Sequence, residues 1–217
     1  DKRPAFEMFA APELEAPPIT VGVVGSLWVD PLWHAARLDR LILPDQTIAR
    51  ALHAEGRPAD QLVPIGLGVC GRFGIGVREG REDCRKTLGL PRDRRTLLVV
   101  AETLWADEVP AWLAPAAGLD EPLTVLVDAP GDRLALEQAR ATFEELGLEG
   151  RIFGRVDEAG LYWGSADRVV CRALDGLVTR ALAFRCPVWA FPPLDDRQRG
   201  ILTGLEQLSA GTAVAGP

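Results

Sequence analysis

Short apolar runs alternate with helix-like segments along most of this chain. Apolar runs rich in Val, Leu and Ile lie at 96–101, 123–129, 150–154, 167–173 and 186–191. Strands that read as nearly continuous apolar runs are typical of sheets buried on both faces. Strands that alternate with helices of about 10–15 residues form parallel βαβ units. The sequence therefore predicts an α/β fold with a doubly wound, Rossmann-like parallel sheet.

The intervening segments have the apolar spacing of amphipathic helices. The clearest is 132–147, where Leu136, Ala139, Phe143 and Leu146 fall on one face. Further helices are predicted at 81–90, 107–118, 158–166, 174–185 and 196–211.

A shorter block of the same kind comes first in the chain. Strands are predicted at 19–26, 38–44 and 61–69, with a helix between the last two that is capped by Asp45 and ends at Gly56. The domain boundaries that follow are an extended lead-in at 1–18, a partial N-terminal subdomain at 19–70, a linker at 71–80 and a C-terminal domain at 81–217.

Composition excludes several classes of function. Lys and Arg number 24 against 31 Asp and Glu, so the net charge of -7 argues against nucleic-acid binding. No run approaches the roughly 18 apolar residues of a membrane helix, and the N-terminus lacks the apolar core of a signal peptide. We therefore expect a cytoplasmic protein with no transmembrane segment. Peripheral contact with a membrane is an open alternative, but the sequence shows no clear apolar or basic patch that would support it.

Metal and cofactor chemistry is not expected. The chain has two histidines, and its four cysteines show no CxxC spacing. Cys171 and Cys186 lie in apolar surroundings and are predicted to be free, buried thiols.

Two local motifs have an alternative, structural interpretation. The letters GLGVCG at 66–71 match a dinucleotide fingerprint, but no helix opening follows them, which favours a glycine-rich linker. Asp30 and His34 are spaced to share a helical face. As an acid–base pair they are candidate catalytic residues. The favoured interpretation is a pair of surface groups beside Pro31.

The order of these elements resembles a known family. The run ITVGVVGSLWVDPLWHAARLDRLILP and the stretch RIFGRVDEAGLYWGSADRVVCRALDGLVTRALAFRCPVWAF are similar to GT-B glycosyltransferases. The branch it resembles contains monogalactosyldiacylglycerol synthase and the bacterial peptidoglycan N-acetylglucosaminyltransferase. The resemblance covers about residues 19–215. It implies a nucleotide-sugar-binding C-terminal domain preceded by the last βαβ portion of an N-terminal Rossmann-like domain.

Relative to the full enzymes, two parts of the fold have no counterpart in this sequence. These are the early half of the N-terminal domain and the helix that follows the last segment. We expect either a fragment of a longer protein or a protein that has lost these parts.

At the positions of this sequence that correspond to the family's functional residues, other residue types are found. A Thr-Asp pair of the family corresponds to Val24 and Gly25, and its histidine corresponds to Asp30. The family's glycine-rich turn lets backbone amides approach the diphosphate, whereas here the turn is 101–105 and includes the acidic Glu102.

The other functional positions of the family are replaced as well. The family's phosphate and ribose contacts correspond to Leu174, Leu177 and Arg180, and its last loop corresponds to 195–197. The resemblance thus implies a glycosyltransferase scaffold without the ordinary UDP-sugar site. The candidate ligand-binding residues are Glu102, Trp105, Arg172, Arg180, Asp196 and Arg197.

Two main functions follow, one without catalysis and one with it. The favoured one is a pseudoenzyme that holds a protein partner or a nucleotide sugar in an interdomain cleft. The alternative is a divergent glycosyltransferase that moves a sugar from a UDP-sugar to a lipid or sugar acceptor. It would bind the diphosphate through Arg172, Arg180 and Arg197, with no metal or other cofactor. A third interpretation is another nucleotide-binding or sugar-epimerase-like activity. For Trp105, core packing is favoured over ligand or protein contact.

Overall fold

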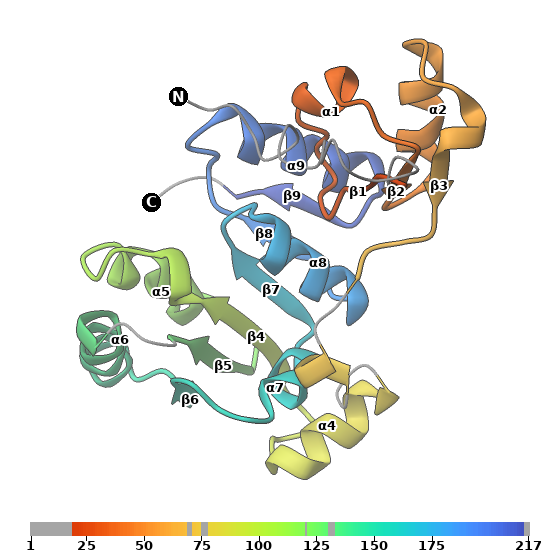
Figure 1. Ribbon diagram of the computed structural model, residues 1–217. Coiled ribbons are helices and arrows are strands. Elements are labelled where there is room, and N and C mark those ends of the chain that lie inside the picture. Colours follow the sequence, from red (N-terminus) through yellow and green to blue (C-terminus); the bar gives the residue numbers. More distant parts are fainter. Residues whose placement is uncertain (1–18, 69–70, 75–77, 120, 130–132, 215–217) are drawn as a thin grey trace. The chain divides into compact units, whose positions relative to one another are not determined.

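The computed structural model describes residues 19–68, 71–74, 78–119, 121–129 and 133–214. The chain divides into two compact units, Asp1–Gly68 and Val69–Pro217, which we call unit 1 and unit 2. Each unit has a parallel sheet with flanking helices (Figure 1). The predicted Rossmann-like α/β fold is therefore confirmed.

Unit 1 has a three-stranded parallel sheet in the order β1-β2-β3. The carboxylate of Asp45 accepts hydrogen bonds from the backbone N–H groups of Thr47 and Ile48, so the predicted cap starts the second helix. The elements are β1 (Val21–Val23), α1 (Leu32–Ala35), β2 (Arg40–Leu43), α2 (Gln46–Ala54), the 3-10 helix η2 (Ala59–Gln61) and β3 (Leu62–Pro64).

Unit 2 has a six-stranded parallel sheet in the order β6-β5-β4-β7-β8-β9. Its first elements are the 3-10 helix η3 (Gly71–Phe73), α4 (Arg81–Leu88), β4 (Arg95–Val100), the 3-10 helix η4 (Ala101–Thr103), α5 (Val109–Ala117), β5 (Leu123–Asp128) and α6 (Arg133–Leu146). The remaining elements are β6 (Gly150–Phe153), α7 (Ala159–Ser165), β7 (Arg168–Cys171), α8 (Asp175–Ala183), β8 (Val188–Ala190), α9 (Asp196–Gln207) and β9 (Gly211–Ala213).

The strand order of unit 2 reverses between β4 and β7. From β4 the chain builds outward through β5 and β6, and it then returns to place β7 on the other side of β4. In open α/β sheets, ligands bind outside the carboxyl ends of the strands at such a switch point. This position defines where a site is to be sought.

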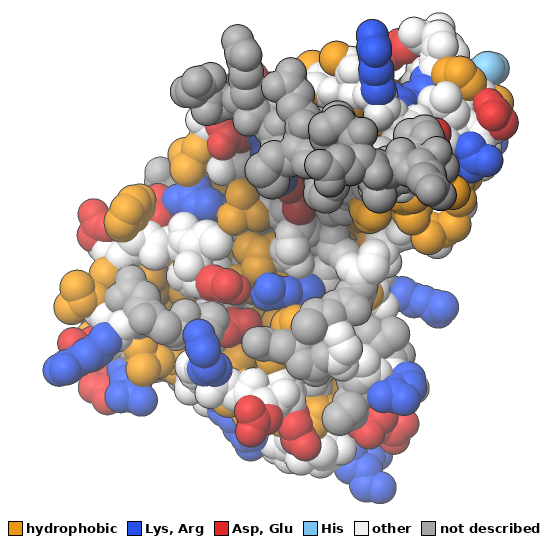
Figure 2. All heavy atoms as spheres, in the orientation of Figure 1, with side chains coloured by type: hydrophobic (Ala, Val, Ile, Leu, Met, Phe, Trp, Pro, Cys, Tyr) orange, Lys and Arg blue, Asp and Glu red, His pale blue; other side chains and the backbone are white. Residues whose placement is uncertain are grey.

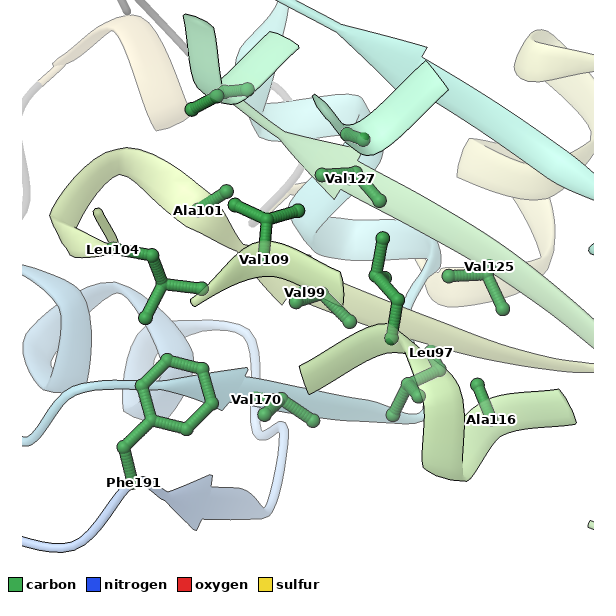
Figure 3. Packing of buried hydrophobic residues seen from close by; sticks show 14 residues of the cluster. Leu97, Val99, Ala101, Leu104, Val109, Ala116, Val125, Val127, Val170 and Phe191 are labelled. Atoms are coloured by element: carbon green, nitrogen blue, oxygen red, sulfur yellow. The ribbon is translucent and has the colours of Figure 1, made fainter. Parts of the chain in front are cut away.

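The core of unit 2 explains why its strands read as continuous apolar runs. Val99, Val127 and Val170 come from three neighbouring strands and pack with Val109 of α5 (Figure 3). The helices α5 and α6 lie on one face of the sheet and α8 on the other (Figure 1). Both faces of each central strand are therefore buried, as predicted.

The C-terminal end of unit 2 differs from the prediction. The helix predicted over 196–211 ends at Gln207, and Gly211–Ala213 form the edge strand β9. Ser209 has a φ of +52°, which turns the chain out of the helix. A Cβ at Gly211 would lie 2.6 Å from the carbonyl oxygen of Val188, so the missing side chain allows this close pairing.

Part of the predicted linker at 71–80 packs within unit 2. Phe73 of η3 is buried, and its ring meets the Trp163 ring edge-on at a centroid distance of 6.3 Å. A Cβ at Gly160 of α7 would lie 2.9 Å from the carbonyl oxygen of Phe73. Glycine at this position therefore lets η3 lie directly against α7. The motif at 66–71 includes residues 69–70, which lie outside the described residues.

The cysteines behave as predicted. Cys171 and Cys186 are free and buried. Cys84 is buried as well. Burial raises the pKa of Cys171 to about 12 and that of Cys186 to about 11, which leaves both as inert thiols at neutral pH. Among the described helices, none combines the length and the apolar character needed to cross a membrane.

Candidate functional site

Arg172 directly follows β7, at the switch point of unit 2. Its side chain is only 7% exposed. Its Nε donates to the carbonyl oxygen of Thr103 at 3.0 Å, and its Nη2 lies 2.8 Å from both carboxylate oxygens of Glu108. The guanidinium carbon also lies 5.8 Å from the centroid of the Phe191 ring. The guanidinium therefore ties the segment after β4 to the end of β7.

Glu108 was not among the predicted site residues, yet it is the partner of this arginine. Partial burial tends to raise the pKa of the Glu108 carboxyl. The hydrogen bond from the backbone N–H of Trp105 and the Arg172 guanidinium outweigh that effect, so the pKa lies below its usual value. Glu108 is therefore ionised at neutral pH and neutralises Arg172.

This pair should make the stability of unit 2 sensitive to acid. Because folding lowers the pKa of Glu108, its contribution is present above the unfolded-state pKa of about 4.3 and is lost as the pH falls through the folded value. We expect the difference in Tm between the wild type and Glu108→Gln to shrink on acidification. Thermal unfolding from neutral pH to about pH 3 measures this. A difference that stays constant over that range would contradict the assignment.

Arg180 and Glu102 form a second pair across the switch point. Glu102 lies in η4, immediately after β4, and its Oε2 is 3.4 Å from Nη1 of Arg180 on α8. The guanidinium carbon of Arg180 lies 4.8 Å from the centroid of the Phe73 ring and 5.7 Å from that of Trp163. Ring faces and a carboxylate thus hold this arginine from two sides.

A third carboxylate lies at the start of α8. Asp175 is the first residue of that helix, and its Oδ2 pairs with the guanidinium of Arg197. Its Oδ1 is buried and has no hydrogen-bond partner in the described part of the chain. A helix N-terminus attracts anions, and here the chain supplies the anion itself.

Two other candidates at this edge of the sheet project into solvent. The side chain of Trp105 is 75% exposed, so the prediction of core packing is wrong for this residue. Its backbone N–H donates to Oε2 of Glu108 at 2.9 Å. Asp196 is almost fully exposed and lies 3.5 Å from Arg199 in the same helix. Neither side chain fills the turn after β4.

Asp30 and His34 have separate partners in unit 1. The carboxylate of Asp30 accepts a hydrogen bond from the backbone N–H of Leu32 at 2.9 Å and so caps a short turn. Nδ1 of His34 lies 2.7 Å from Oε2 of Glu55 at the surface. These contacts fit the interpretation as surface groups and give no support to an acid–base pair.

The site therefore contains three arginine–carboxylate pairs. Guanidinium groups bind phosphates well, but each one here already faces a carboxylate of the same chain. A diphosphate would have to displace these carboxylates or share the arginines with them. Among the described residues, no group of His, Cys, Asp and Glu is arranged to hold a metal ion.

No known protein family matches the sequence, and no curated protein matches it. Similar solved structures do exist. MurG of Acinetobacter baumannii aligns with a TM-score of 0.61 and 15% identity over 89% of this chain and 52% of MurG. Sucrose-phosphate synthase of Thermosynechococcus elongatus aligns with a TM-score of 0.53 and 16% identity over 93% of this chain and 56% of the synthase.

A glycosyltransferase of Rickettsia africae gives a comparable match. The TM-score is 0.52 and the identity 12%, over 90% of this chain and 56% of that enzyme. This chain thus spans a little over half the length of the three proteins. At such identities the likeness concerns the fold. The chain has a Rossmann-like α/β fold of the kind found in GT-B glycosyltransferases.

Proposed function

We propose that this chain is a non-catalytic binding module built on a glycosyltransferase fold. The observation that carries the proposal is the pairing of Arg172 with Glu108 and of Arg180 with Glu102 at the switch point. Asp175 at the start of α8 adds a third carboxylate to those of Glu102 and Glu108. A sugar donor would bring its diphosphate, which is also negatively charged, to this edge of the sheet. Like charges at close range oppose binding of that donor.

The exposed ring of Trp105 gives such a module a contact point for a protein partner. Large aromatic side chains supply much of the binding energy at protein interfaces. Trp105 follows η4 and needs no rearrangement to become accessible, because three quarters of its surface already is. The proposed role is therefore to hold a protein through the carboxyl edge of the sheet in unit 2.

A thermal-shift titration with UDP-N-acetylglucosamine and UDP-glucose tests the first half of this proposal. A ligand at about 100 times its Kd stabilises a protein by about 2.7 kcal/mol, which is readily measured as a rise in Tm. We expect no rise for the wild type. We expect a rise for the double variant Glu102→Ala, Glu108→Ala, in which both arginines are released.

The alternative function is a divergent glycosyltransferase. The position of Arg172 and Arg180 at the switch point favours it, since this is where donors bind in such folds. A nucleotide-dependent rise in the Tm of the wild type that Arg180→Ala abolishes would support this alternative. Sugar transfer to a lipid or sugar acceptor by the wild type would overturn the non-catalytic proposal.

A further inference from the structure

The helix α5 is apolar on its outer side as well as on its inner side. Its nine residues, VPAWLAPAA, are all apolar or aromatic. Val109 and Leu113 are buried against the sheet, whereas Ala114 and Ala117 are exposed. Figure 2 shows hydrophobic side chains at the surface over α5, at the left of the view. A helix that is apolar all round is normally covered on all sides, so the outer side of α5 is a surface suited to contact with a further molecule.

The exposed indole of Trp105 adds to this surface, in the turn that leads into α5. Its backbone is fixed at both ends. The N–H donates to Oε2 of Glu108 at 2.9 Å, and the carbonyl oxygen accepts from the backbone N–H of Glu108 at 3.0 Å. A large ring on a fixed backbone loses little freedom on binding, which is typical of the anchors of protein interfaces. We call Trp105 and the exposed residues Ala114, Pro115, Ala117 and Leu119 the outer surface of α5.

The charge around this indole is negative. Between Arg95 and Arg133 the sequence has seven acidic residues and no Lys, Arg or His. The carboxylates of Glu102 and Glu108 face arginines of other elements. Asp107 is exposed and faces no cation in the part of the chain that the structure describes. A partner therefore meets a negative charge beside an exposed ring.

This combination selects a partner by its chemistry. The face of an indole attracts the cation of a Lys or Arg side chain, and a neighbouring carboxylate strengthens that attraction. An acidic segment would be repelled by Asp107. The small apolar side chains of α5 leave room for larger apolar side chains of the partner. A segment with one apolar and one basic side meets both requirements, as amphipathic helices do when they bind an apolar surface.

We propose that the outer surface of α5 binds a basic, apolar segment of a partner protein. A Lys or Arg of the partner lies over the Trp105 ring and pairs with Asp107, and apolar side chains of the partner pack on Ala114 and Ala117. This inference rests on the proposed function, in which unit 2 holds a protein, and it adds the chemistry of the segment that is held.

A peptide titration of the whole chain tests the proposal. The probe is a fluorescein-labelled peptide of about 14 residues with Leu on one helical face and Lys and Arg on the other. Fluorescence anisotropy should show saturable binding to the wild type. The same peptide with Glu in place of every Lys and Arg should not bind, because Asp107 repels it.

Two pairs of variants separate this surface from the net negative charge of the protein. Trp105→Ala should lower the affinity for the basic peptide by about tenfold, and Trp105→Phe, which keeps a ring, by less. Asp107→Asn should lower it by about two- to fivefold. The matched control is Asp93→Asn, which removes the same charge from an exposed position before β4, at the opposite end of that strand. It should leave the affinity unchanged.

The possible outcomes distinguish this inference from the proposed function. Absence of saturable binding of the basic peptide would overturn the inference, and so would equal affinities of the wild type and Trp105→Ala or of Asp107→Asn and Asp93→Asn. Tighter binding of the Glu peptide would overturn it too, but would leave unit 2 as a module that holds a protein. The proposed function itself fails in a separate measurement, by the transfer of sugar from a UDP-sugar.

Discussion

Replacing Trp163 with alanine should lower the free energy of unfolding of unit 2 by about 3–5 kcal/mol, as is usual for large aromatic residues in a core. The indole is fully buried in α7. Its ring lies 6.3 Å from that of Phe73 and 6.4 Å from that of Phe184, measured between centroids. Alanine would leave a cavity where η3, α7 and α8 meet, and these elements cannot close it by a small shift.

A hydrogen bond adds to this loss. Nε1 of Trp163 donates to Oδ2 of Asp128 at 3.3 Å, and Asp128 is itself buried at the end of β5. The variant Trp163→Phe keeps most of the packing but removes the donor. Its expected loss is therefore smaller, about 0.5–1.5 kcal/mol, the net contribution of a typical hydrogen bond.

Urea unfolding followed by far-UV circular dichroism measures both variants without relying on tryptophan fluorescence. The matched control is Trp105→Ala, which removes the same side chain from an exposed position and should change stability by no more than about 0.5 kcal/mol. Equal losses for Trp105→Ala and Trp163→Ala would contradict the packing of η3 and α8 around α7.

Most strands and helices could be predicted because their signals are local. The apolar runs at 96–101 and 123–129 coincide with β4 and β5 within one residue, since strands buried on both faces need apolar side chains throughout. Helix ends that carry a characteristic terminating residue could be predicted equally well. Gly89, for example, ends α4 with a φ of +62°, a conformation that glycine adopts without strain.

The composition of the candidate site could be predicted only in part. Arg172 and Arg180 follow from the rule that ligands bind at the carboxyl ends of parallel strands. Their partners do not, because Glu108 and Glu102 lie 64 and 78 residues away in the sequence. The pairs exist only once β4 and β7 are adjacent, and no local pattern of charge marks them. The strand β9 was missed for a related reason, since its pairing depends on contact with β8.

Arg172→Ala should lower the free energy of unfolding of unit 2 by about 2–4 kcal/mol, because the carboxylate of Glu108, which is only 32% exposed, loses its opposite charge and keeps only the hydrogen bond from the Trp105 backbone. The carbonyl oxygen of Thr103 also loses its donor at 3.0 Å. Arg172→Lys keeps the charge but cannot reproduce the two contacts of a planar guanidinium, so an intermediate loss is expected. Chemical unfolding of the three proteins under one set of conditions measures these effects.

A double-mutant cycle then decides whether Glu108 or a ligand is the natural partner of Arg172. If the pair is structural, Arg172→Ala and Glu108→Ala together should cost less than the sum of the single changes, with a coupling energy of about 1–3 kcal/mol. The matched control is Arg133 with Glu137, an exposed pair four residues apart on α6, for which about 0.3–0.5 kcal/mol is expected. A coupling at Arg172 as small as that of the control would mean that its guanidinium is not committed to Glu108. The arginine would then be available to a diphosphate, and the divergent glycosyltransferase would become the better account of this site.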